Sequence, residues 1–187
     1  MEQLLLLSSI LLWVLVIVNL VLTLALVRRI NAASQPRESL KEGQPAPHFS
    51  AETLRGETVT LQSFTGRNVA FLFVEPACGP CREALPIYER LGPKAAQANV
   101  DLVLVSTADS ERTRRFVDEF NITLPILIAP HESNPFTKDY LVSGTPAYCL
   151  IDTEGKVQST GSPNLKWGKW KALAEAWEKQ AKQSTVS

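Results

Sequence analysis

The sequence of 187 residues contains only three cysteines, two histidines and one methionine. These few ligand side chains are scattered along the chain, which argues against a zinc site built from four protein ligands. Lysine and arginine total 19 and are balanced by 19 aspartate and glutamate residues, so the charge gives no argument for nucleic-acid binding. We therefore expect no metal ion, no other cofactor and no nucleic-acid partner.

Charged side chains are absent between Leu4 and Val27, where almost every residue is apolar. A helix over this run would be about 36 Å long, which is enough to cross a bilayer. A cleaved signal peptide is the alternative, but no positive side chain precedes the run, and the run exceeds a typical signal core. We predict a transmembrane helix at 4–27, a polar linker at 28–41 and one domain at 42–183.

The rest of the chain alternates between short apolar runs rich in β-forming residues and amphipathic segments. An extended region or β-hairpin is expected first. The expected strands are 69–74, 100–106, 124–129, 146–152 and 156–160, and the expected helices are 79–97, 109–120 and 164–182, with a short helix before the last two strands. Two strand–helix units followed by a hairpin and a terminal helix describe an α/β fold with a mixed central sheet between helices.

The motif Cys78-Gly79-Pro80-Cys81 lies between a buried strand and the start of a helix. In this context a CxxC pair indicates redox chemistry rather than metal binding. Unpaired backbone N–H groups and the positive end of the helix dipole favour a thiolate there. We expect Cys78 to be the exposed nucleophile and Cys81 to resolve the mixed disulfide. Gly79 leaves room for ring closure, and Pro80 stands where a missing N–H costs little.

A structural disulfide and a metal site are the alternatives for this pair. A disulfide that closes a loop over two intervening residues constrains the unfolded chain very little, so this pair would stabilise the fold only slightly. Zinc would need further ligands, and Cys149 with His48 or His131 is a weakly supported choice for them. Cys149 itself lies in an apolar strand and is expected to fill the core.

Thr145-Pro146 directly precedes an expected strand. A cis bond here would turn the chain sharply and present backbone beside the cysteines. An extended substrate could then pair with this backbone as a short strand. An ordinary trans proline at the start of a strand is the alternative. We expect the cis form.

These motifs resemble the thioredoxin-like fold over residues 42–182. The patterns G-x-x-A-P-x-F and G-x-x-V-T-L, and a proline five residues after the second cysteine, are similar to membrane-anchored redoxins of the TlpA and ResA type. The apolar N-terminus and the form V-x-P-x-C-x-x-C look most similar to the methylamine-utilisation accessory proteins called MauD. The resemblance implies that Cys78 is the nucleophile, Cys81 the resolving thiol and Pro146 the cis proline.

The chain also departs from the pattern of these families. Ala77 stands where thioredoxins usually have tryptophan, Leu72 replaces their buried acid, and Ala84 replaces a glutamate common in ResA-type proteins. The usual proton acceptor for the resolving cysteine is therefore missing. Glu75 and Glu83 are the alternatives, although Glu83 also fits a solvated helix residue.

The leading hypothesis is a membrane-tethered thiol–disulfide oxidoreductase that acts on protein disulfides or thiols. The resemblance implies maturation of an exported protein, either a methylamine dehydrogenase-type or a cytochrome-type client, together with an unidentified redox partner. It also implies an extracytoplasmic domain, whereas Arg28 and Arg29 after the apolar run favour the cytoplasm. Two arginines are a modest bias, and long domains cross the membrane regardless of charge.

Two other functions are compatible with parts of the pattern. A peroxiredoxin-like peroxidase would share the P-A-P-x-F opening, but it usually has threonine or serine three residues before its cysteine, where Glu75 stands here. A redox-inert assembly factor would use the same fold to bind a partner. Such a factor has no need of the intact CxxC pair.

Overall fold

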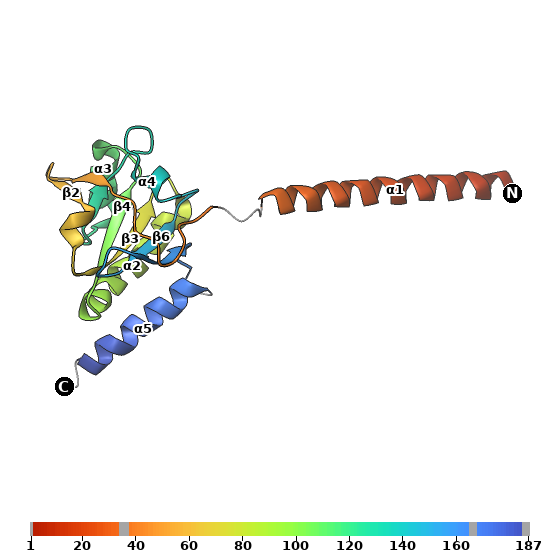
Figure 1. Cartoon of the computed structure of the whole chain (residues 1–187). Coiled ribbons are helices and arrows are strands. Elements are labelled where there is room, and N and C mark those ends of the chain that lie inside the picture. Colours follow the sequence, from red (N-terminus) through yellow and green to blue (C-terminus); the bar gives the residue numbers. More distant parts are fainter. Residues whose placement is uncertain (1, 34–37, 165–167, 185–187) are drawn as a thin grey trace. The chain divides into compact units, whose positions relative to one another are not determined.

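The computed structural model describes residues 2–33, 38–164 and 168–184 of the chain (Figure 1). The chain divides into two compact units, one up to Glu38 and one from Ser39 onward. Leu165 and Trp167, which belong to the expected closing helix, lie outside the described residues.

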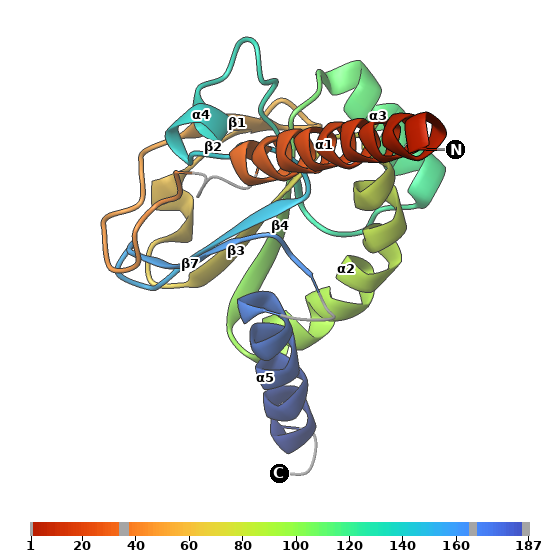
Figure 2. The same ribbon diagram turned by 90° about the vertical axis from the view of Figure 1, so that its right-hand side faces the viewer.

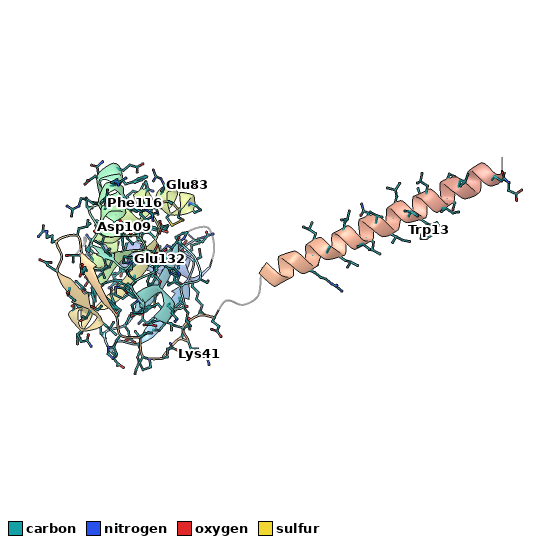
Figure 3. The ribbon with its side chains drawn as sticks, turned by 90° about the horizontal axis from the view of Figure 1, so that it is seen from above. Trp13, Lys41, Glu83, Asp109, Phe116 and Glu132 are labelled. Carbon is teal, nitrogen blue, oxygen red and sulfur yellow. A yellow bond between two sulfur atoms is a disulfide. The ribbon has the colours of Figure 1, made fainter. Side chains whose placement is uncertain are left out.

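The first unit is the helix α1 (Glu2–Ala33). Its segment Leu7–Arg28 is long and apolar enough to cross a membrane. The large apolar side chains of this segment are exposed, and Figure 3 shows side chains, including Trp13, projecting from several sides of the helix. The helix continues beyond the predicted span to Ala33.

Seven strands form one sheet in the order β2-β1-β5-β4-β3-β6-β7. Their bounds are β1 Ser50–Thr53, β2 Thr58–Thr60, β3 Asn68–Val74, β4 Val100–Ser106, β5 Ile126–Ile128, β6 Ala147–Ile151 and β7 Val157–Gly161. Strands β3, β4 and β5 run parallel, and the remaining pairings are antiparallel. The predicted mixed sheet is thus confirmed, and its parallel strands end at one common edge.

Helices cover both faces of this sheet, and Figure 2 shows α2 and α5 on one side and α4 on the other. Their bounds are α2 Gly79–Gln97, α3 Ser110–Phe120, α4 Phe136–Asp139 and α5 Lys169–Ser184, with a short 3-10 turn at Leu61–Phe64. Side chains alternate along β3. Leu72 and Val74 point into the core formed with α2, α3 and α5, whereas Phe71 and Phe73 point toward α4.

The segment before β1 protects one edge of the sheet. The Gly43 N–H donates to the Val157 carbonyl at 2.8 Å, and the Val157 N–H donates to the Gln44 carbonyl at 2.9 Å. Pro45 forms an isolated antiparallel bridge with Lys156, just before β7. The opposite edge is β2, a strand of three residues.

Candidate active site

The dithiol lies where the amino end of α2 follows β3. Cys78 is the N-cap of the helix and forms a disulfide with Cys81, with 5.2 Å between the two Cα atoms. The backbone N–H of Cys81 donates to the Cys78 sulfur at 3.2 Å. Cys78 is half-buried, whereas Cys81 is fully buried. This difference in exposure suits an attacking and a resolving thiol, and the N–H bond favours negative charge on the attacking sulfur.

Thr145 and Pro146 meet the dithiol from the neighbouring strand. Strand β6 begins one residue after Pro146 and runs antiparallel to β3, so its amino end lies beside the carboxyl end of β3. The Thr145–Pro146 peptide bond is cis, as expected. The Thr145 carbonyl oxygen lies 3.5 Å from the Cys78 sulfur. A backbone acceptor therefore lies beside the Cys78 sulfur.

Glu75 connects the loop before Cys78 to the β4–α3 junction. Its carboxylate accepts a hydrogen bond from the Thr107 hydroxyl at 2.6 Å and an ion pair from Arg112 at 2.6 Å. Its carbonyl oxygen accepts the Cys78 N–H at 2.9 Å. The carboxylate thus links the loop before Cys78 to a hydroxyl after β4 and to a cation on α3.

Thr107 and Arg112 are site residues that the sequence reasoning missed. The signal was available, because parallel strands end at the same edge of a sheet. Thr107 directly follows β4 just as Glu75 directly follows β3, and the register pairs the preceding residues, Val74 and Ser106. Arg112 lies in the first turn of α3, which Asp109 caps by accepting its N–H at 2.9 Å.

The other positions considered for a proton acceptor carry no buried acid. Leu72 is fully buried, Ala84 is half-buried, and Glu83 is exposed on α2, as Figure 3 shows. Glu83 is therefore placed as a solvated helix residue. Glu75 is the remaining candidate, and its transfer of a proton with Cys81 stays a prediction.

A small groove of about 200 Å³ lies beside the dithiol. Its lining residues are Pro76, Ala77, Arg82, Arg112, Arg115, Phe116 and Glu119. Arg82 donates to the Pro76 carbonyl at 3.2 Å, pairs with Glu119 and stacks on the Phe120 ring at 4.7 Å. Ala77, which directly precedes Cys78 in the chain, is one of the residues that line this groove.

A larger and more apolar cavity of about 730 Å³ lies away from the dithiol. It is lined by the second half of α2, by β1 and β2 and by the loop before β5. That loop leads into the amino end of β5, at the opposite edge of the parallel strands from the cysteines. This cavity therefore lies apart from the disulfide of Cys78 and Cys81.

Cys149 is buried in β6 opposite Phe71, which confirms the expectation that it fills the core. Burial raises the pKa of the Cys149 thiol to about 12, so this thiol stays protonated and unreactive at neutral pH. Among residues 2–33, 38–164 and 168–184, no three His, Cys, Asp or Glu side chains gather into a metal site.

We predict that Arg112→Ala lowers the thiolate fraction of reduced Cys78 at neutral pH. Without Arg112, the Glu75 carboxylate is left uncompensated next to the loop that carries the sulfur, and a like charge disfavours the thiolate. Absorbance of the thiolate at 240 nm, followed against pH, measures this fraction. We expect a twofold to fivefold slower attack on a small disulfide at pH 7, about 0.5–1 kcal/mol for a half-exposed pair.

The double variant Glu75→Gln, Arg112→Ala should restore most of the rate, because it removes both charges. Arg114→Ala on the same helix is the matched control, since Arg114 instead donates to the Leu54 carbonyl. Equal thiolate titration in the Arg112 variant and the wild-type protein would contradict this role.

Comparison with known proteins gives a consistent result. A model of the Redoxin family matches residues 41–176. A thioredoxin-like protein, YneN of Bacillus subtilis, is 35% identical over 128 residues, covering 67% of this chain and 74% of YneN. The thiol-disulfide oxidoreductase ResA of Bacillus cereus is 28% identical over 121 residues, covering 64% of this chain and 69% of ResA.

Solved structures agree with the fold. A thiol:disulfide interchange protein DsbE from Chlorobium tepidum has a TM-score of 0.62 and 29% identity, covering 76% of this chain and 96% of the other. The thioredoxin domain of a thiol-disulfide oxidoreductase from Bacteroides vulgatus has a TM-score of 0.64 at 23% identity, covering 75% of this chain and 98% of the other.

Proposed function

The chain belongs to the redoxin family and is a thiol–disulfide oxidoreductase of thioredoxin-like fold, and we propose that α1 holds it at a membrane while Cys78 and Cys81 exchange disulfides with protein clients. The observation that carries the proposal is the disulfide at the start of α2, with one half-buried and one fully buried sulfur beside the Thr145 carbonyl.

In the reducing direction, the Cys78 thiolate attacks a client disulfide. A mixed disulfide forms, and the client's first sulfur leaves as a thiolate and takes up a proton. The Cys81 thiolate then attacks the Cys78 sulfur, closes the intramolecular disulfide and releases the client's second thiolate. Two electrons pass to the client, and a redox partner that supplies a dithiol restores the enzyme. The oxidising direction is the same sequence in reverse.

The membrane tether is supported by the apolar segment of α1, which is long enough for one span. Resemblance to the anchored redoxins supports an extracytoplasmic domain and a role in maturing an exported client. A methylamine dehydrogenase-type or a cytochrome-type protein is the client class this resemblance favours. Protease added to intact spheroplasts should cut the domain, and a domain that stays uncut would place it in the cytoplasm.

The reduction potential of the full-length protein in detergent micelles tests the direction of exchange. A reduction potential of about −270 mV would indicate a reductant that draws on a membrane electron donor. A potential of about −120 mV would indicate an oxidant that installs disulfides. Equilibration with glutathione and thioredoxin, read by alkylation of free thiols, gives the value. Failure of Cys78 and Cys81 to form a reversible disulfide would overturn the enzymatic proposal in favour of a redox-inert assembly factor.

A further inference from the structure

Leu141 has a backbone conformation that leucine rarely adopts. Its φ is +53°, in the left-handed region where a Cβ atom crowds the following carbonyl group. The other described residues with positive φ are all glycine or asparagine, the two residue types that tolerate this region. Leu141 is the exception among them.

The end of α4 imposes this conformation. The Leu141 N–H donates to the Lys138 carbonyl at 3.0 Å, and the Val142 N–H donates to the Thr137 carbonyl at 2.9 Å. These two bonds form the Schellman motif that closes a helix, and Leu141 occupies the position where glycine is usual. The motif requires a left-handed backbone conformation at this position. Leucine adopts it with a steric penalty from its Cβ atom, which glycine does not have.

The side chain at this costly position is also exposed. Leu141 is 38% exposed, and within residues 38–164 and 168–184 it is the only exposed large apolar side chain. The residues on either side pack inward. Tyr140 is buried with its hydroxyl donating to the Pro47 carbonyl at 2.9 Å, and Val142 packs against the core. Leu141 therefore leaves part of an apolar side chain in solvent at a position where the backbone favours glycine.

Leu141 lies on the segment that approaches the dithiol. It precedes Thr145 by four residues, which span at most about 14 Å, and the Thr145 carbonyl lies 3.5 Å from the Cys78 sulfur. A polypeptide joined to Cys78 and extended along the backbone that leads from Thr145 toward Leu141 would reach Leu141 within about four residues. The helix-closing bonds explain the conformation but not the choice of leucine, and strained residues of this kind cluster at functional sites.

From these observations we infer that Leu141 contacts the client polypeptide and favours an apolar side chain within about four residues of the client's reacting cysteine. The inference rests on the proposed exchange with protein clients and adds a preference to it. The contact buries apolar surface on both partners, and the leucine is held in place by the helix-closing bonds. Leu141 is thus a specificity residue, with no part in the transfer of electrons.

The test uses Leu141→Gly in the full-length protein, because glycine is the preferred residue for this backbone. The variant should unfold at the same or a higher denaturant concentration than the wild-type protein, since the left-handed conformation no longer carries a Cβ penalty. Misfolding therefore cannot account for a lost activity. Leu141→Asn, also compatible with the backbone, separates the loss of the apolar group from the added freedom of glycine.

Exchange is measured with three disulfides: two peptides that differ only in leucine or aspartate within four residues of the cysteine, and one small aromatic disulfide. We expect the wild-type protein to prefer the leucine peptide about tenfold in kcat/KM, and both Leu141 variants to lose most of this preference. Rates with the small disulfide should not change.

Asn121→Gly is the matched control. Asn121 ends α3 with a φ of +50°, in the loop before β5 and thus at the sheet edge opposite the cysteines. It should keep the wild-type preference. An unchanged peptide preference in Leu141→Gly, or none in the wild-type protein, would overturn the inference alone. A wild-type protein that reacts with the small disulfide but with neither peptide would overturn the proposed protein clients as well.

Discussion

Cys78→Ser abolishes disulfide exchange, with a fall of about a thousandfold or more to the uncatalysed rate. A serine hydroxyl neither ionises at neutral pH nor forms a bond to a client sulfur. Cys81 is fully buried, so it cannot take over the attack. The measurement is the rate of reduction of a disulfide-bonded protein by the reduced enzyme. The fold should persist, because a disulfide across two intervening residues contributes little to stability.

Cys81→Ser provides the complementary result. This variant keeps the attacking sulfur but cannot resolve the mixed disulfide, so it should accumulate covalent adducts with its clients. Non-reducing electrophoresis of membranes from cells that express it shows these adducts, which reductant removes. Cys149→Ser is the control and should behave as the wild-type protein, because its thiol is buried. Wild-type exchange rates in Cys78→Ser would refute the assigned nucleophile.

Trp170→Ala lowers the free energy of unfolding by about 3–5 kcal/mol. Trp170 is 1% exposed and lies between α2, β6 and the rest of α5. Its ring centroid is 4.8 Å from that of Tyr148, 5.5 Å from Trp177 and 6.5 Å from Tyr88. Removal of the indole leaves a cavity where α5 packs on the sheet. Urea unfolding followed by circular dichroism of the full-length protein in micelles gives the change.

Two variants separate the effect of the cavity from other causes. Trp170→Phe should cost much less, because most of the ring volume stays and the indole N–H has no acceptor among the described residues. Lys171→Ala, at the exposed neighbouring position, should change stability by less than about 0.5 kcal/mol. A loss below about 1 kcal/mol in Trp170→Ala would mean that α5 contributes little to the fold.

The regular elements were largely predictable because their signals are local. The run Val100–Ser106 and the segment Gly79–Gln97 were predicted with the bounds that the structure shows. Pro86 lies inside α2, as the sequence indicated. The strand expected at 124–129 is shorter, Ile126–Ile128, and at its start the Leu124 N–H donates to the Glu89 carboxylate rather than to a neighbouring strand.

The reactive atoms were predictable from the motif, but their surroundings were not. CxxC at a helix start and a proline before a strand are visible in the sequence as short patterns. The Glu75–Arg112 pair joins residues far apart in the chain, and only the pairing of β3 with β4 brings them together. The sequence does not distinguish Leu141 from other leucines, because no pattern of apolar residues predicts a positive φ.

The pairing of the segment before β1 with the edge strand β7 also bears on how the protein avoids aggregation. An open strand edge can pair with the same edge of another molecule, a risk that grows when many domains share one surface. The residues Gly43 to Pro45 occupy part of that edge, and the three-residue β2 offers little to pair with at the other. A soluble fragment that begins at Pro47 would uncover β7 and invite intermolecular sheets, whereas one that begins at Ser39 keeps the edge closed.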